Sequence, residues 1–269
     1  MRVAAIQMTS TPDKAHNLGE AHRLLREACD RGAELVAFPE YFSLLTDDKK
    51  AYLAEAETLR GMTVETLQEW AAEYDVWILG GSIPLKAPGS KKLTNTSLLI
   101  TSEGQIQARY DKIHLFDVDL SGDRKYHESD TIQAGSKVVC AKVPYGKAGL
   151  SICYDLRFPE LYRNMARQGV HFIFAPSAFT AFTGKAHWDL LTRARAVENQ
   201  AFLIAPAQTG KPYAGRETHG HTRIVDPWGR IIAERPAGPG VVMAELDLKE
   251  LERVRKEMPV LTRRKLKQV

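Results

Sequence analysis

The beginning of the chain alternates between short apolar runs and one amphipathic segment. Residues 3–8 are mostly apolar and predict a strand, and residues 11–13 (Thr-Pro-Asp) predict a helix start with proline at the first helical position. Apolar residues then recur at helical spacing as far as Ala28, and Gly32 predicts the end of this helix. Residues 35–38 are continuously apolar, as in a strand covered on both faces. The order strand, helix, strand predicts a layered α/β architecture.

The same alternation continues along the rest of the chain. Helical spacing predicts helices over residues 60–74, 159–166, 188–199 and 248–258. Apolar runs predict strands over residues 77–82, 97–101, 105–109, 138–143, 148–153, 170–175, 201–205, 221–225, 230–233 and 241–246. Residues 117–135 are polar and predict a long loop. No linker-like segment divides the chain, so we predict a single domain over residues 1–269, in which two sheets pack face to face with helices outside.

Composition and charge restrict the classes of partner. The chain is 44% hydrophobic and 26% charged, and its net charge is only +4. Basic residues cluster only at residues 263–267, where a solvated terminus explains them better than nucleic-acid binding does. No apolar run approaches the ~18 residues that a membrane span needs, and the first residues lack a secretory signal core. We therefore expect neither a nucleic-acid nor a membrane partner.

The cysteines and histidines indicate a compartment and argue against a metal site. The three cysteines, Cys29, Cys140 and Cys153, are too few for a disulfide framework, so we expect a reducing, cytoplasmic environment. No Cys or His pair has the spacing of zinc ligands. His219 and His221 are accordingly expected to be loop or packing residues.

Three reactive side chains stand at or just after the ends of predicted strands. Taken singly, Glu40 could cap a loop, Lys112 could be a surface charge and Cys153 could be a small buried hydrophobe. Together they meet the needs of thiol-based acyl transfer, which are a nucleophile, a base and a cation for the developing oxyanion. A cysteine between a strand and a helix can lie near backbone N–H groups, so we expect a lowered thiol pKa at Cys153.

Three segments around these residues carry a family resemblance. They are residues 38–40 (Phe-Pro-Glu), 110–115 (Tyr-Asp-Lys-Ile-His-Leu) and 153–160 (Cys-Tyr-Asp-Leu-Arg-Phe-Pro-Glu). In this order and spacing they resemble the catalytic blocks of the nitrilase, or carbon–nitrogen hydrolase, superfamily. The resemblance extends through residues 184–188, 193–199 and 225–229. It implies a four-layer α-β-β-α sandwich that dimerises through its helical layers and needs neither a metal nor an organic cofactor.

The resemblance also implies roles for individual residues. Glu40 would be the general base, Lys112 the cation and Cys153 the nucleophile. Glu128 matches a second glutamate that many members place beside the lysine, although its polar surroundings would also suit an ordinary solvated turn. The backbone N–H of Tyr154 would be the other oxyanion donor.

Within the superfamily the chain is most similar to the Nit-type amidases, such as deaminated glutathione amidase and ω-amidase, which act on amides of oxo-dicarboxylic acids. This similarity implies that Arg157, Phe179 and Thr183 contact the substrate carboxylate. The alternatives are that Arg157 pairs with an acidic neighbour and that Phe179 is simply part of the core. Residues 211–219 match neither subgroup clearly, and we expect them to border the pocket.

The predicted function is hydrolysis of a small carboxylate-bearing amide through a cysteine thioester, with deaminated glutathione or a related ω-amide of an oxo acid as substrate. ω-Amidase activity on 2-oxoglutaramate or 2-oxosuccinamate, N-carbamoyl hydrolysis and nitrile hydrolysis stay open, because all use the same three residues. A non-enzymatic alternative is an inactive scaffold or binding protein, against which the intact Glu40, Lys112 and Cys153 argue. We expect a homodimer.

Overall fold

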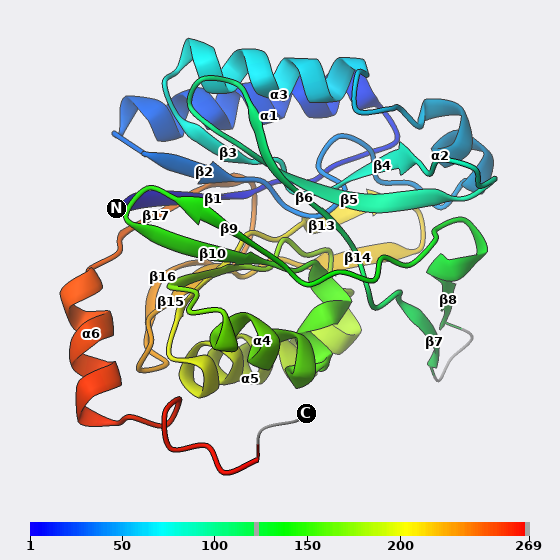
Figure 1. Cartoon of the computed structure of the whole chain (residues 1–269). Coiled ribbons are helices and arrows are strands. Elements are labelled where there is room, and N and C mark those ends of the chain that lie inside the picture. The colour runs from blue at the N-terminus through cyan, green and yellow to red at the C-terminus, as the bar shows by residue number, and fades with distance from the viewer. Residues whose placement is uncertain (121–123, 267–269) are drawn as a thin grey trace.

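Two sheets lie face to face between two layers of helices (Figure 1). This computed structural model describes residues 1–120 and 124–266. The first sheet has the order β17 (Gly240–Glu245), β1 (Arg2–Gln7), β2 (Leu35–Ala37), β3 (Trp77–Leu79), β5 (Leu93–Ile100) and β4 (Ile83–Lys86), and β6 (Ile106–Asp111) also pairs with β5. The second has the order β16 (Ile231–Arg235), β15 (Thr222–Val225), β12 (Phe202–Ala205), β11 (Phe172–Phe174), β10 (Gly146–Leu150) and β9 (Val139–Val143).

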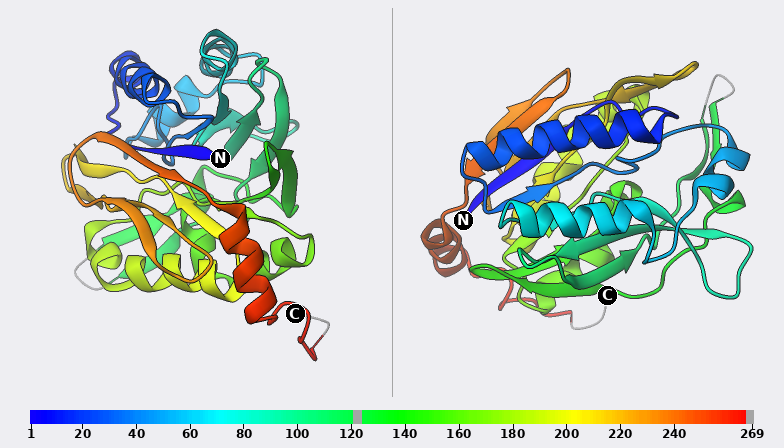
Figure 2. Two further views of the ribbon diagram at one scale, coloured as in Figure 1. Left: turned by 90° about the vertical axis from the view of Figure 1, so that its left-hand side faces the viewer. Right: turned by 90° about the horizontal axis from the view of Figure 1, so that it is seen from above.

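The helices cover the outer faces of this pair of sheets. Figure 2 shows α1 (Lys14–Asp30) and α3 (Met62–Glu73) side by side above the first sheet. The helices α4 (Pro159–Arg167) and α5 (Ala181–Asn199) lie against the second sheet, and α6 (Leu248–Glu257) follows β17 at the edge of the molecule (Figure 1). The predicted four-layer α-β-β-α sandwich is therefore confirmed. The prediction of a single domain over residues 1–269 stays a prediction.

The continuously apolar strands are explained by burial on both faces. In β1, Val3 and Ala5 belong to the core between the two sheets, whereas Ala4 and Ile6 belong to the core under α1 and α3. Successive side chains of a strand point to opposite faces, so a strand with a core on each side must be apolar at every position.

The ends of the predicted helices needed correction. The first helix begins at Lys14, because the side chain of Asp13 caps it by accepting a hydrogen bond from the backbone N–H of His16 at 3.0 Å. Pro12 therefore precedes the cap, and its prediction as the first helical residue is wrong. Helix α5 begins at Ala181, seven residues (188 − 181) before the predicted start, because Thr180 supplies its cap.

Several short elements at one end of the sandwich were missed. The predicted loop over residues 117–135 contains the hairpin β7 (Asp117–Leu120) and β8 (Arg124–His127), followed by the 3₁₀ turn η1 (Glu128–Asp130). A second hairpin, β13 (Thr209–Tyr213) and β14 (Arg216–His219), and the helix α2 (Lys49–Glu55) were also not predicted. These elements are too short to show a clear periodicity.

No helix within residues 1–120 and 124–266 is both long and apolar enough to cross a lipid bilayer. Of the basic cluster at residues 263–267, Arg263 and Lys265 are exposed, and Arg264 is half-buried. Lys267 lies outside the described residues.

Candidate active site

All the residues predicted for the site line one cavity of about 470 Å³. Glu40 follows β2 and Lys112 follows β6, so both come from the first sheet. Cys153 follows β10 of the facing sheet, at the start of the 3₁₀ turn η2 (Cys153–Arg157). The cavity is lined by Glu40, Lys112, Glu128, Cys153, Tyr154, Arg157, Phe179 and Thr183, together with residues that the sequence analysis did not single out. The packing of one sheet on the other therefore brings the predicted residues together.

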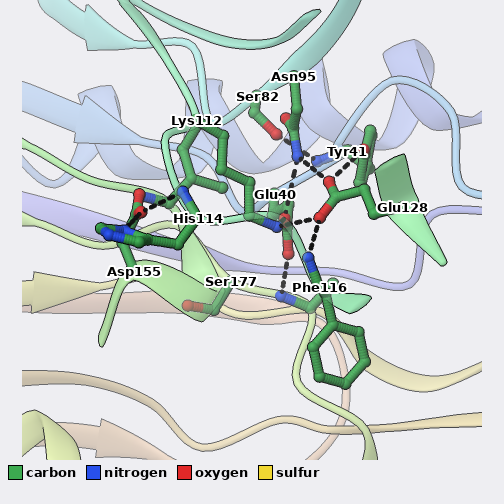
Figure 3. Close-up of polar contacts among 12 residues, drawn as sticks. Glu40, Tyr41, Ser82, Asn95, Lys112, His114, Phe116, Glu128, Asp155 and Ser177 are labelled. Carbon is green, nitrogen blue, oxygen red and sulfur yellow. Dashed lines mark hydrogen bonds and ion pairs between the residues drawn. The ribbon is translucent and has the colours of Figure 1, made fainter. Parts of the chain in front are cut away.

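Lys112 lies between two carboxylates in the wall of this cavity (Figure 3). Its Nζ donates to Oε1 of Glu40 and to Oε2 of Glu128, each at 2.8 Å. The side chains of Lys112 and Glu40 are buried, and that of Glu128 is only 11% exposed. Lys112 is therefore buried rather than a surface charge, and Glu128 lies beside it, while the catalytic roles stay predictions.

Lys112 and Glu128 each stabilise the charged form of the other. Burial alone would lower the pKa of Lys112, but the carboxylates of Glu128 and Glu40 outweigh it and hold that pKa well above its usual range. For Glu128, burial acts to raise the pKa, but Lys112 and a hydrogen bond from the backbone N–H of Phe116 at 2.7 Å lower it overall. Lys112 is therefore an ammonium and Glu128 a carboxylate at neutral pH.

Asn95 and Tyr41 complete the support of the carboxylates, and the sequence analysis missed both. Asn95 donates through Nδ2 to Oε1 of Glu40 at 3.1 Å and to Oε1 of Glu128 at 3.0 Å. The hydroxyl of Tyr41 donates to Oε1 of Glu128 at 2.9 Å. A signal for Asn95 existed, because residues 94–97 are all polar yet lie in the fully buried strand β5.

The other carboxylate oxygen of Glu40 is also held. Its Oε2 accepts a hydrogen bond from the backbone N–H of Ala178 at 2.9 Å, and Ala178 belongs to the loop between β11 and α5. Glu40 therefore contacts Lys112 and Asn95 on one oxygen and the second sheet on the other. Its orientation is set by groups from both sheets.

The turn that carries Glu40 depends on a close approach of two loops. Gly81 has φ +49°, and a Cβ there would lie 2.1 Å from the carbonyl oxygen of Pro39. The next residue, Ser82, accepts a hydrogen bond from the backbone N–H of Tyr41 through its hydroxyl at 3.1 Å. Only glycine at position 81 allows this contact without displacing the backbone before Glu40.

Cys153 occupies a strained elbow rather than the end of the strand. Strand β10 ends at Leu150, and Cys153 has φ +48°, a left-handed conformation that is costly for a residue with a side chain. Its backbone N–H donates to the carbonyl of Pro176 at 2.9 Å, which ties the elbow to the loop after β11. The N–H of Tyr154 has no hydrogen-bond partner within the described part of the chain.

The expected lowering of the Cys153 pKa is wrong. Burial and the neighbouring Glu40 raise the pKa of this thiol well above its ordinary value, and Lys112 offsets only part of the effect. The side chain is 7% exposed, so the desolvation of a thiolate outweighs nearby backbone dipoles. Cys153 is therefore a neutral thiol at neutral pH, next to Glu40.

Asp155 joins the segment that carries the lysine to the turn that carries the cysteine. Its Oδ2 accepts from the hydroxyl of Tyr110 at 2.6 Å and from the backbone N–H of Ile152 at 2.8 Å. Its Oδ1 accepts from the backbone N–H of His114 at 3.1 Å, and Nδ1 of that histidine lies 2.7 Å away (Figure 3). Asp155 is completely buried, and its role was not predicted although it lies inside the quoted block.

Two of the three predicted carboxylate contacts, Arg157 and Phe179, lie near each other, and Thr183 also lines the cavity. The guanidinium carbon of Arg157 is 5.4 Å from the ring centroid of Phe179 and 5.6 Å from that of Tyr154. Its Nη1 donates to Nδ1 of His187 at 3.1 Å rather than to a carboxylate, so the alternative of an acidic partner is not seen among the described residues. Phe179 packs edge-on against Trp188 at 5.0 Å and also lines the cavity, so it serves both core and pocket.

The hairpin β13–β14 borders the cavity, as predicted for residues 211–219. Tyr213 and Arg216 line it. Nη2 of Arg216 donates to the carbonyl of Ala178 at 2.8 Å. His219 and His221 stack at 4.5 Å, which agrees with their prediction as packing residues. No group of three or more His, Cys, Asp or Glu residues in the described ranges is arranged to hold a metal ion.

Replacing Glu128 with glutamine is expected to destabilise the fold in a pH-dependent way. The folded-state pKa of Glu128 is lowered, so its carboxylate contributes stability above the unfolded pKa of about 4.3 and loses it as the pH falls through the folded pKa. At pH 7 the variant should lose about 3 kcal/mol in the free energy of unfolding. Urea unfolding at pH 7 and at pH 4 measures this difference, which should shrink on acidification.

The exposed Glu65 in the first turn of α3 provides the matched control, and its glutamine variant should behave like the wild type. A destabilisation by Glu128→Gln that is the same at both pH values would show that shape, rather than charge, holds Glu128 in place.

Comparisons with known proteins agree with this fold. A family profile for carbon-nitrogen hydrolases matches residues 2–256. A deaminated glutathione amidase from Synechocystis sp. is 47% identical over 264 residues, which cover 97% of each chain. An omega-amidase from Xenopus tropicalis is 37% identical over 265 residues, covering 98% of this chain and 95% of the relative. The structure of Nit3 from Saccharomyces cerevisiae, a member of branch 10 of the nitrilase superfamily, has a TM-score of 0.90 at 33% identity and covers 99% of this chain and 97% of that chain.

The four-layer sandwich with a buried thiol, lysine and carboxylates at one end defines a class of hydrolase. The chain belongs to the carbon–nitrogen hydrolase family, which confirms the resemblance found in the sequence. It is an enzyme that hydrolyses carbon–nitrogen bonds other than peptide bonds.

Proposed function

We propose that this enzyme hydrolyses the amide bond of a small ω-amide of an oxo acid, with deaminated glutathione as the substrate, through a thioester on Cys153. The observation that carries the proposal is that Cys153, Glu40 and Lys112 line the same cavity as Arg157, a cation that makes no ion pair with an acid in the described chain. The relative from Synechocystis sp. that is 47% identical supports the choice of substrate.

The reaction begins with attack by the thiol sulfur on the amide carbon. Glu40 accepts the proton of Cys153 as the sulfur–carbon bond forms, and the carbonyl oxygen becomes an oxyanion. Nζ of Lys112 and the unpartnered N–H of Tyr154 are the donors for that oxyanion. Glu40 then returns the proton to the leaving nitrogen, the carbon–nitrogen bond breaks and the amine departs, leaving the acyl group on the sulfur.

Water completes the cycle at the same carbon. Glu40 takes a proton from the water as its oxygen attacks the thioester, and the second oxyanion meets the same donors. The carbon–sulfur bond breaks, the sulfur regains the proton from Glu40, and the acid leaves. The raised pKa of Cys153 fits this scheme, because the thiol loses its proton only when the substrate is being attacked.

Glu128 acts in this scheme as a positioning residue. It faces Lys112 opposite Glu40 and is itself held by Tyr41, Asn95 and the backbone N–H of Phe116. With two carboxylates on one ammonium, Lys112 keeps its charge and its place when Glu40 is protonated during the reaction. Metal and cofactor play no part in any of these steps.

The part of the cavity lined by Arg157 binds the substrate carboxylate. Arg157 supplies a permanently charged fork suited to two parallel hydrogen bonds with a carboxylate, and Phe179 and Thr183 complete the wall. Because the guanidinium uses one N–H donor for the hydrogen bond to His187, its other N–H donors are available to the substrate.

Replacing Arg157 with methionine is expected to cost roughly 30-fold or more in kcat/KM for substrates with a carboxylate, and far less for uncharged amides. The reason is that the carboxylate would enter the pocket without its partner. The measurement is ammonia or amine release from 2-oxoglutaramate, deaminated glutathione and butyramide, with the wild type and the variant. Equal hydrolysis of butyramide and 2-oxoglutaramate by the wild type would contradict carboxylate selection.

The same measurement separates the alternatives. Greater activity on 2-oxoglutaramate than on deaminated glutathione would favour ω-amidase, the activity named for the relative from Xenopus tropicalis. Adding an N-carbamoyl amino acid and an aliphatic nitrile to the panel tests the other two chemistries. An inactive binding protein would release neither ammonia nor amine from any of them.

We further propose a homodimer that works in the cytoplasm without a nucleic-acid partner. Leu190 and Val197 of α5 are exposed large hydrophobic residues on the outer helical layer, and Trp228 is exposed in the turn whose Gly229 lies against Val197, so a second copy would cover them. The three free cysteines, two of them half-buried, suit a reducing compartment. Light scattering that gives the mass of a monomer would exclude the dimer, and secretion of the protein would exclude the location.

A further inference from the structure

Arg216 is a cavity-lining cation without an acidic partner among the described residues. The two arginines that are buried in the described chain, Arg195 and Arg223, form ion pairs with glutamate or aspartate side chains. Arg216 is half-buried, donates from Nη2 to the carbonyl of Ala178 and also interacts with the side chain of Tyr213, and its guanidinium lies 5.4 Å from the ring centroid of Tyr126. Its Nε is shielded from solvent and has no hydrogen-bond partner within the described residues.

The guanidinium of Arg216 is half-buried, and no acidic side chain of the described residues forms an ion pair with it. Shielded polar groups are nearly always hydrogen-bonded, and a desolvated charge without a counterion is unfavourable. A purely structural arginine, tying β14 to Ala178, needs only one of its five N–H donors. Arg223 also has a shielded Nε without a partner, but its other nitrogens pair with acids, whereas the remaining donors of Arg216 line the cavity without one and are available to an anion there.

Arg216 and Arg157 contact neighbouring residues of the same loop. Arg157 lies over the ring of Phe179, and Arg216 holds the carbonyl of Ala178. The N–H of Ala178 holds Glu40, so the loop between the two arginines borders the reacting groups. The cavity therefore offers two separate guanidinium groups, and a substrate with one carboxylate can satisfy only one of them.

We propose that Arg216 binds a second carboxylate of the substrate, located on the amine portion that leaves first, so that the enzyme selects amides that are anionic at both ends. This inference rests on the proposed function, in which Arg157 takes the carboxylate of the acyl portion. Deaminated glutathione fits, because it has a 2-oxo acid at one end and a glycine carboxylate at the other. 2-Oxoglutaramate has only the first of these and leaves Arg216 without a partner.

The test compares two substrates that differ only at the second carboxylate: deaminated glutathione and its C-terminal glycinamide. With the wild type, kcat/KM should be about 30-fold lower for the glycinamide. Arg216→Met should hydrolyse both at the lower rate, and it should lose far less activity on 2-oxoglutaramate than on deaminated glutathione. Arg157→Met should lose activity on all three.

Arg235→Met is the matched control. Arg235 is also half-buried and donates through Nε to one backbone carbonyl, that of Gly238 at 2.9 Å, but it lies outside the cavity. This variant should keep the wild-type preference for the acid over the glycinamide.

Two results would overturn the inference while leaving the proposed function intact. One is a wild type that hydrolyses the acid and the glycinamide equally, a measurement that needs no variant to fold. The other is an Arg216→Met variant whose kcat/KM falls equally for 2-oxoglutaramate and for deaminated glutathione, which would make Arg216 a positioning residue for Ala178 and Glu40. A wild type that prefers butyramide to 2-oxoglutaramate would instead remove the proposed function, and this subsite with it.

Discussion

Replacing Cys153 with alanine is expected to lower kcat by at least ~10³, because only substrate binding and oxyanion stabilisation remain once the nucleophile is lost. The melting temperature should hardly change, since the substitution removes one sulfur atom beside an open cavity and leaves the charged cluster around Lys112 intact. Steady-state kinetics on deaminated glutathione and thermal unfolding measure the two effects.

Cys29→Ala and Cys140→Ala are the controls. Both cysteines are free and half-buried, and neither lines the cavity, so both variants should keep their activity. Substantial activity in Cys153→Ala, or loss of activity in either control, would contradict the assignment of the nucleophile.

The raised pKa of Cys153 also predicts how the alkylation rate of this residue depends on pH. Alkylating agents react with the thiolate, and burial together with Glu40 keeps the pKa of this thiol well above 9.0. Inactivation by iodoacetamide should therefore still be accelerating as the pH rises through 9.0, the ordinary thiol value. A rate that reaches a plateau below that pH would mean that the thiolate is already formed in the resting enzyme.

Replacing Lys112 with methionine is expected to lower kcat by about 10²–10³, with a much smaller change in KM. The ammonium is needed most when the oxyanion forms, which is why the loss should fall on kcat. The substitution also leaves Glu40 and Glu128 buried without their shared cation, so the free energy of unfolding should fall by about 3–5 kcal/mol.

Arginine should restore little of this activity, because its planar fork does not fit between two carboxylates that share one nitrogen. Lys125→Met, at a lysine that lines the cavity but is exposed, is the control for charge alone. Circular dichroism and urea unfolding identify loss of fold. A folded Lys112→Met variant with nearly normal kcat and a raised KM would make this lysine a substrate-binding residue instead.

Local pattern was sufficient for much of the fold. Helical spacing located α1, α3, α4 and α6, and apolar runs located most strands of both sheets, because these elements present one or both faces to a core. It failed for the start of α1, where Asp13 rather than Thr11 supplies the cap, since both are acceptable caps and only the backbone decides between them. It also failed for the hairpins around the cavity, whose short strands have no repeat to detect.

Some residues of the site could likewise be predicted from the sequence, and others could be recognised only in the structure. Glu40, Lys112 and Cys153 were predicted for the site because each belongs to a recognisable block that follows a strand. The sequence did not single out Asn95, Tyr41 or Arg216. Asn95 and Tyr41 hydrogen-bond to Glu128, which lies 33 and 87 positions away in the chain, and Arg216 hydrogen-bonds to a loop across the cavity. For Asp155, only the structure shows a side chain that joins Tyr110, Ile152 and His114.

By itself, the sequence determined the layered α/β class, the order of the main elements and the family, because these depend on the spacing of apolar residues and on contiguous segments. Only the tertiary structure decided the ionisation of the site. Strand-end position suggested a lowered pKa for Cys153, yet packing one sheet on the other buries the thiol against Glu40 and raises it. Burial and the charges brought near by folding set the energy of a charged group, and neither is a property of the neighbouring residues in the chain.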